Sequence, residues 1–415
     1  MAIQTDESMI EKRSIASMIE WLSSFGKTET DGVTRLLYSP TWMKAQHALK
    51  QEMEACGFQT YFDSVGNLFG RLEGKDKLAK TILTGSHIDT VVDGGKYDGA
   101  YGVIASFLAV RNLFEQYGAP QKTIEVVSFC EEEGSRFPLA FWGSGSITGK
   151  YNLNHVASLK DSDQISFLDA MKDAGFDPDQ YISPVRRDID HFIEIHIEQG
   201  QILERNQHTL GLVTHIVGLR RFTITVRGES NHAGTTPMPF RKDAVCMAAD
   251  FISYVTKKAK EMDPHLVATV GKITVTPNVP NVIAREVEFS LDIRHHQEKV
   301  LGQFYDEIET YFQRIAFEEE MDVVITKIVD VKPVEMNTSL TALSKTITSE
   351  KNIPFQYMIS GAGHDAQILG TFCPTSLLFI PSKDGISHSP KEFTSVADLQ
   401  TGIEVLTEML YKLAY

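Results

Sequence analysis

Five residues of types that bind metal ions are spread over about three hundred positions of this sequence. Each lies in a short glycine-rich or apolar segment, and their side chains are imidazoles and carboxylates, which suit divalent ions such as Zn²⁺ or Mn²⁺. A folded metal site explains this pattern better than five unrelated surface positions would. The five residues are His87, Asp98, Glu133, His196 and His388.

The first segment is an apolar, strand-like run that ends at His87 and then breaks into glycines. Strand ends are where α/β enzymes hold their chemistry. Asp89 lies two residues later, so on an extended backbone its carboxylate faces the same side and could fix the tautomer of His87. Asp98 lies among glycines, where a permissive backbone could turn its carboxylate inward to bridge two metals. Alone, the segment could equally be a turn with a solvated carboxylate.

Three consecutive acids, Glu131, Glu132 and Glu133, follow a second apolar run. Like charges at a strand end repel one another unless a cation or a raised pKa relieves them. We expect Glu133 to bind metal and Glu132 to be the general base, because adjacent carboxylates can divide these tasks. A solvated acidic turn is the alternative for this segment alone. Arg136, just beyond, is expected to be an internal counter-ion.

The two remaining histidines complete two sets of ligands. His196 projects from the polar face of a strand with alternating isoleucines, and His388 lies in a loop after an apolar run. Two imidazoles and a bridging carboxylate would serve one ion, and a carboxylate and an imidazole would serve another. The pattern predicts a dinuclear site with open positions, metals about 3.5–4 Å apart and a bridging water as nucleophile.

The elements that must position these residues alternate between strand and helix patterns up to about residue 210, as in α/β layer structures. Near Gly211 the pattern changes to cleanly alternating strands, which predict an antiparallel sheet with one covered face. We expect an α/β catalytic domain, residues 1–210 and 329–415, with a mixed, mainly parallel sheet flanked by helices. A smaller α+β, ferredoxin-like domain, residues 211–328, interrupts it.

Composition narrows the class of protein. The chain has 415 residues, 42% of them hydrophobic, and a net charge of −15, which fits a globular protein and argues against a nucleic-acid partner. Its four cysteines show no CxxC spacing and are expected to be free thiols. We see no signal peptide and no apolar run of the roughly 20 residues that a membrane span needs. A cytoplasmic protein without a membrane partner is expected.

Five motifs around these residues resemble a known family: Gly85-Ser-His-Ile-Asp-Thr, Gly94-Gly-Lys-Tyr-Asp-Gly, Glu131-Glu-Glu-Gly-Ser-Arg-Phe, His196-Ile-Glu-Gln-Gly and Ile386-Ser-His-Ser. They resemble the M20 metallopeptidase-like amidohydrolases, in particular the branch that hydrolyses ureido compounds. This branch includes allantoate amidohydrolases, N-carbamoyl-L-amino-acid hydrolases and β-ureidopropionases. The resemblance covers the chain from about residue 10, and the segments Phe141-Trp-Gly-Ser and Ser360-Gly-Ala-Gly-His-Asp-Ala look most like the allantoate enzymes.

The resemblance implies two divalent metal ions per subunit, Mn²⁺ or Zn²⁺. One would lie among His87, Asp98 and His196, and the other among Asp98, Glu133 and His388, with Glu132 as the base. The inserted domain would serve as a lid and as the contact of a homodimer.

The resemblance also implies residues that bind the substrate. His232 would stabilise the oxyanion, from the same or the partner subunit, and Asn281 and Arg294 would hold a substrate carboxylate. Gln199, Gly361 and His364 are further candidates. For Gln199 a structural hydrogen bond is the alternative, and for His364 a loop-fixing contact with Asp365.

We therefore expect hydrolysis of a ureido C–N bond in a small carboxylate, foremost allantoate, to ureidoglycine, ammonia and CO₂ in purine nitrogen catabolism. An N-carbamoyl-L-amino-acid hydrolase or β-ureidopropionase is the alternative, with a dipeptidase or aminoacylase more remote. A non-catalytic dimeric metal-binding protein is a different class of hypothesis. Glu132 beside a full ligand set argues against it, because a structural metal site needs no spare base.

Overall fold

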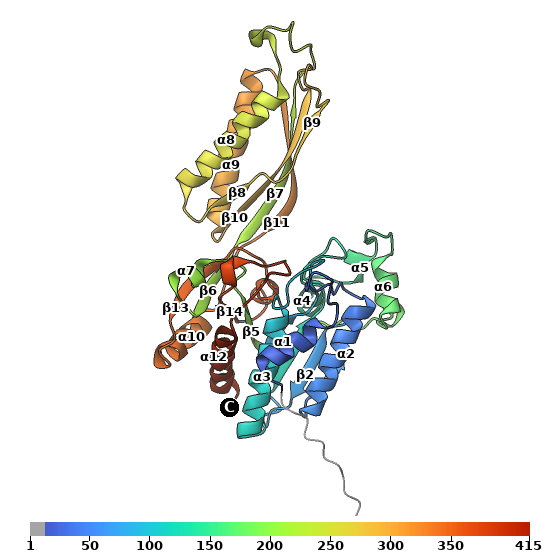
Figure 1. The fold of residues 1–415 in the computed structure, drawn as a ribbon, viewed down its shortest axis with the longest axis vertical. Coiled ribbons are helices and arrows are strands. Elements are labelled where there is room, and N and C mark those ends of the chain that lie inside the picture. The colour runs from blue at the N-terminus through green and yellow to red at the C-terminus, as the bar shows by residue number, and fades with distance from the viewer. Residues whose placement is uncertain (1–12) are drawn as a thin grey trace, which may run out of the picture. The chain divides into compact units, whose positions relative to one another are not determined.

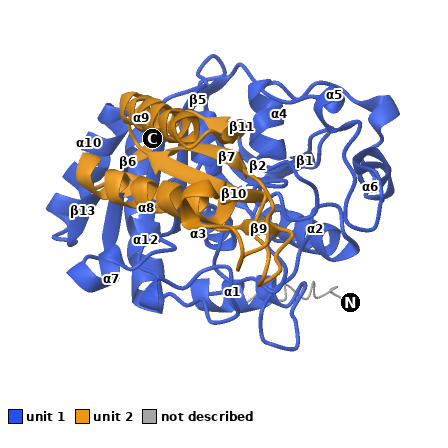
Figure 2. Ribbon diagram, turned by 90° about the horizontal axis from the view of Figure 1, so that it is seen from above, with its two compact units in different colours: residues 1–214, 336–358, 364–415 blue, residues 215–335, 359–363 orange. Residues whose placement is uncertain are grey.

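Residues 13–415 are described by a computed structural model, in which the chain forms two compact units (Figure 1, Figure 2). Unit 1 contains the chain up to Thr214 together with residues 336–358 and 364–415. Unit 2 contains residues 215–335 and the short segment 359–363. The expected boundaries of the inserted domain were 211 and 328. Unit 2 begins four residues later and ends seven residues later; its last long strand, β11 (Asp322–Val331), continues past residue 328.

Unit 1 is built on a mixed sheet whose four central strands, in the order β4-β3-β5-β14, run parallel. Antiparallel strands extend it on both sides. Strands β3, β4 and β14 are buried along their whole length, as expected for parallel strands covered on both faces. The strands of this sheet are β1 (Gln59–Phe62), β2 (Leu68–Leu72), β3 (Thr81–His87), β4 (Ile124–Phe129), β5 (Ile189–Ile197), β6 (Leu210–Ile216), β12 (Val334–Glu335), β13 (Phe355–Ser360) and β14 (Thr375–Ile380).

Helices cover this sheet. Helix α3 begins directly after Asp98 and Gly99; it packs against β3 and lies beside α12 (Figure 1). Serine or asparagine side chains cap the first turns of α1, α2, α10 and α12. The helices are α1 (Ile15–Ser23), α2 (Pro40–Ala55), α3 (Ala100–Tyr117), α4 (Trp142–Thr148), α5 (Leu153–Val156), α6 (Phe167–Asp173), α7 (Ile202–Asn206), α10 (Thr338–Glu350), α11 (Asp365–Leu369) and α12 (Val396–Ala414).

Unit 2 is an antiparallel sheet in the order β11-β7-β10-β8, with β9 also paired to β10. In chain order this is the 4-1-3-2 arrangement of a ferredoxin-like fold. Along β10 buried and half-buried residues alternate, because one face packs on α8 and α9. The elements are β7 (Gly218–Arg227), α8 (Ala244–Met262), β8 (Val267–Thr269), β9 (Ile273–Thr276), β10 (Glu286–His295), α9 (Glu298–Glu318) and β11.

The predicted fold class is therefore confirmed: an α/β unit with a mixed sheet and a separate antiparallel α+β unit inserted into it. Among the helices of residues 13–415, none has the length and apolar composition that a membrane span requires.

Candidate dinuclear metal site

The five predicted ligands of unit 1 come together in two groups that share Asp98. One group is His87, Asp98 and His196, and the other is Asp98, Glu133 and His388; in each group the possible ligand atoms lie within 4.8 Å of one another. Topology explains this, because parallel strands end at the same edge of a sheet. His87 ends β3 and His196 lies near the end of β5. Asp98 lies in the segment after β3, Glu133 in the segment after β4, and His388 in the segment after β14.

Each oxygen of Asp98 faces a different group. The Nε2 atom of His196 lies 3.2 Å from Oδ1 of Asp98, and that of His87 lies 3.7 Å from the same oxygen. The Nε2 atom of His388 lies 3.2 Å from Oδ2 of Asp98 and 3.5 Å from Oε1 of Glu133. The Asp98 carboxylate is thus placed to bridge two cations.

The two buried imidazoles are oriented by backbone carbonyl groups. Nδ1 of His87 lies 3.0 Å from the carbonyl oxygen of Asp89, and Nδ1 of His196 lies 2.9 Å from that of Ile197. When Nδ1 carries the proton, Nε2 keeps its lone pair. That of His87 lies toward Asp98, whereas that of His196 accepts the N–H of Gly99 at 3.0 Å, a contact that a metal ion would replace.

Asp89 approaches His87 with both its backbone carbonyl and its carboxylate. Its carboxylate oxygen Oδ1 lies 3.6 Å from Nδ1 of His87, farther than the carbonyl oxygen of the same residue. Its other oxygen accepts the backbone N–H of Glu133 at 3.1 Å. In this structure Asp89 thus orients His87 through its backbone, and its side chain instead helps to hold Glu133.

The buried acids of the site perturb one another. Burial raises the pKa of Glu132 well above its usual value, and burial together with Asp98 raises the pKa of Glu133 to about 7. Burial opposes ionisation of Asp98 too, but hydrogen bonds with His196 and His388 hold its pKa well below the usual range. Bound cations would relieve this repulsion.

The donor set fits two divalent ions. It combines imidazole nitrogens with carboxylate oxygens, the nitrogens face the carboxylates, and Asp98 offers one oxygen to each group. Such a set suits Zn²⁺ and Mn²⁺ alike. Oε2 of Glu132 lies 3.8 Å from Nε2 of His87, so a carboxylate outside the two groups borders them. The ligand and base assignments themselves stay predictions.

Two substrate-binding candidates lie beside the metal-binding groups. Nε2 of Gln199 donates to Oδ2 of Asp98 at 2.8 Å, which is the structural hydrogen bond left open by the sequence. The ring of His364 lies 4.6 Å from that of His196, and the residue is 2% exposed. Burial, with a contribution from His196, lowers the pKa of His364 well below its usual value. The loop-fixing contact with Asp365, which was the alternative for His364, is not formed here, since Nε2 of His364 and both Asp365 carboxylate oxygens lack hydrogen-bond partners.

The other substrate-binding candidates belong to unit 2, where they form two pairs. The backbone of the His232 loop pairs with the Asn281 loop: the N–H of Ala233 donates to the Asn281 carbonyl at 3.0 Å. Nη1 of Arg294 donates to the Gly361 carbonyl at 2.9 Å, and its Nε donates to Asp292 at the same distance. Arg294 and Gly361 line one pocket of about 500 Å³.

Three further residues hold the metal-binding groups without having been predicted. Glu194, fully buried, accepts the hydroxyl of Ser86 at 2.7 Å and the N–H of Ala366 at 2.8 Å. Ser387 and Glu392 hold the loops of Asp98 and His388. Glu194 lies on the same polar strand face as His196. The alternation of isoleucines with polar residues in this strand could therefore have indicated that Glu194 lies near the site. Glu392 carried no comparable signal.

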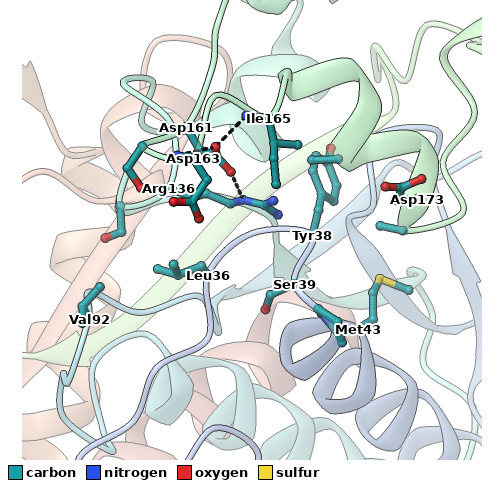
Figure 3. A pocket seen from close by; sticks show the side chains of 15 residues that line it. Leu36, Tyr38, Ser39, Met43, Val92, Arg136, Asp161, Asp163, Ile165 and Asp173 are labelled. Atoms are coloured by element: carbon teal, nitrogen blue, oxygen red, sulfur yellow. Dashed lines mark hydrogen bonds and ion pairs between the residues drawn. The ribbon is translucent and has the colours of Figure 1, made fainter.

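A larger pocket of unit 1, about 700 Å³, contains none of the predicted ligands (Figure 3). Arg136 lies on its wall, where Nε pairs with Asp161 at 3.0 Å and Nη1 donates to the Leu37 carbonyl at 2.8 Å. These contacts are those of the internal counter-ion expected from the sequence.

Gly99 gives the first mutational prediction. Its φ is 61°, and a Cβ there would lie 2.4 Å from Nε2 of His87. We expect Gly99→Ala to add about 1–3 kcal/mol of backbone strain and also to displace His87, so that metal content falls. Gly118→Ala is the matched control, because its φ is 73° but a Cβ there meets nothing within 4 Å. Metal analysis and thermal unfolding of both proteins check this; equal metal content in both would contradict it.

Known proteins with similar sequences include metal-dependent hydrolase families, in agreement with the two metal-binding groups. Residues 83–412 match the sequence profile of peptidase family M20/M25/M40. The allantoate amidohydrolase of Bacillus subtilis (strain 168) is 47% identical over 404 residues, which are 97% of this chain and 98% of that protein. The N-carbamoyl-L-amino-acid amidohydrolase of Pseudomonas sp. (strain NS671) is 36% identical over 97% of this chain and 98% of its own.

A solved structure shows the same fold. The crystal structure of an amidase of the hydantoinase/carbamoylase family from Burkholderia multivorans aligns with a TM-score of 0.91 and 32% identity, covering 96% of this chain and 97% of that one.

Proposed function

Because the chain belongs to peptidase family M20/M25/M40, we propose that it is a metal-dependent amidohydrolase that cleaves a ureido C–N bond of allantoate. The observation that carries the proposal is the pair of metal-binding groups joined by Asp98, with Glu132 at their border. The substrate is supported by the identity of 47% to an allantoate amidohydrolase, against 36% to an N-carbamoyl-L-amino-acid amidohydrolase.

The two groups would each hold one divalent ion, Mn²⁺ or Zn²⁺. When bound, these ions polarise a carbonyl and lower the pKa of a water molecule. Glu132 would accept the proton of the attacking water and pass it to the leaving nitrogen. Its carboxylate borders His87 without belonging to either group, which supports this role. Water and allantoate would give ureidoglycine and carbamate, which decays to ammonia and CO₂.

The groups of unit 2 would bind the rest of the substrate. Arg294 would pair with the carboxylate, because its guanidinium is held in place by Asp292 and Gly361 and lines a pocket. Asn281 would add an amide contact, and His232, from the same or the partner subunit, would stabilise the oxyanion. Gln199 and His364, beside Asp98 and His196, would contact the substrate from unit 1.

The chain would act as a homodimer through unit 2. Met238 and Phe240, just after the His232 loop, are 68% and 77% exposed, and they would be covered in a dimer formed through this part of unit 2. Light scattering should give the mass of two chains; the mass of one chain at every concentration would contradict the dimer.

Substrate choice is tested with metal-loaded protein offered allantoate, an N-carbamoyl-L-amino acid and a dipeptide in parallel. We expect the highest kcat/KM for ammonia release from allantoate. A preference for the carbamoyl amino acid would keep the chemistry and replace the substrate. Inactivity on all three with metal bound would favour a binding protein instead.

A further inference from the structure

Glu392 is a buried acid in the loop that carries His388. It lies four residues after His388 and is 4% exposed. A buried carboxylate is unfavourable unless hydrogen bonds replace its hydration. Both oxygens of Glu392 are indeed engaged, and they bind two different segments of the chain.

The first oxygen binds the backbone next to Asp98. Oε1 of Glu392 accepts the N–H of Tyr97 at 2.7 Å and the N–H of Asp98 at 3.0 Å. Successive backbone N–H groups form a concave site for an anion. Gly95 makes this approach possible, since a Cβ at that position would lie 2.1 Å from the carboxyl carbon of Glu392.

The second oxygen binds the residue next to His388. Oε2 of Glu392 lies 2.8 Å from the hydroxyl of Ser387, which is also 3.1 Å from Oδ2 of Asp98. The side chain of His388 is 50% exposed and its φ is 53°. Packing therefore holds this imidazole weakly, and its position depends on the hydrogen bonds of its loop.

We propose that Glu392 is a positioning residue that keeps Asp98 and His388 at the spacing needed to share a metal ion. The inference rests on the proposed function, because it assumes that these two side chains are ligands. It predicts that loss of Glu392 weakens metal binding more in the group that contains His388 than in the group that contains His87 and His196. His87 and His196 come from strands and are each 1% exposed, so the group that they form with Asp98 depends less on this tie than the group that contains His388.

The test is the number of Zn²⁺ or Mn²⁺ ions per chain, and the affinity for each, in the Glu392→Ala and Glu392→Gln proteins. Glu392→Ala should keep one ion and bind the other about 10–100-fold more weakly, the loss typical of a group that orients a ligand. Glu392→Gln should lose less, because its amide oxygen can still accept both backbone N–H groups. A merely structural residue would lower the affinity for both ions alike, with no rescue by glutamine.

Gly95→Ala tests the same contact of the Glu392 carboxylate by changing the backbone segment that it binds. Its methyl group should displace the carboxylate and reproduce the selective loss, whereas in the Glu392→Ala background it should add nothing. Glu404→Ala, an exposed acid on α12, is the control that should bind both ions normally. Folded Glu392→Ala and Gly95→Ala proteins that bind both ions with unchanged affinity would overturn the inference. Unmodified protein that binds no metal would instead overturn the proposed function.

Discussion

Glu132→Gln protein is expected to bind two metal ions and to release ammonia from allantoate about 10²–10⁴-fold more slowly than the unmodified protein, the usual effect of losing a general base. The amide has nearly the shape of the carboxylate but cannot accept the proton of the attacking water. Because Glu132 lies outside both metal-binding groups, its replacement should leave the ligands in place. The slower ammonia release should therefore appear as a lower kcat, while the metal content of the protein stays unchanged.

Parallel measurements of kcat and metal content separate this result from a loss of ligands. Glu404→Gln removes an exposed acid from α12 and should keep full activity. Near-normal turnover by metal-loaded Glu132→Gln protein would show that another group is the base. Loss of metal from that protein would show that Glu132 is a ligand rather than a base.

Asp98→Asn should have the second large effect, because Asp98 is the residue that the two metal-binding groups share. An amide offers one oxygen in place of two, so at least one ion loses its bridge and the imidazoles of His196 and His388 lose their ionic partner. We expect metal affinity to fall by more than the about 10–100-fold that accompanies loss of a ligand-orienting group. Activity should fall with it and return only in part at high metal concentration.

Asp93→Asn is the matched control for Asp98→Asn. Asp93 lies in the same loop, and its carboxylate accepts the hydroxyls of Thr28 and Thr30, which an amide oxygen can also do. This protein should keep both ions. Asp98→Asn protein that binds two ions as tightly as the unmodified chain would exclude a bridging role for Asp98.

The fold and the two ligand groups could be predicted because they follow from local patterns. A strand that ends in His87, three acids after a strand, and isoleucines that alternate with His196 each indicate which way a side chain points. Parallel topology then places the ends of these strands at one edge of the sheet. Clean alternation in β10 likewise indicated the separate antiparallel sheet.

Contacts that depend on tertiary structure could not be predicted. The orientation of His87 by the backbone carbonyl of Asp89, instead of its carboxylate, depends on how the chain turns after β3. The hydrogen bond of Gln199 to Asp98 joins residues about a hundred positions apart. Glu392 looks like any acid of a polar loop until the backbone of residues 97–98 is folded against it. No sequence period connects such positions.

The most direct test of metal-dependent ureido hydrolysis is a titration of metal-free protein with Mn²⁺ or Zn²⁺, with ammonia release from allantoate followed at each step. We predict no release without metal and a rate that rises to a plateau at two ions per chain. Full activity in metal-free protein, or no release from allantoate with two ions bound, would contradict this account.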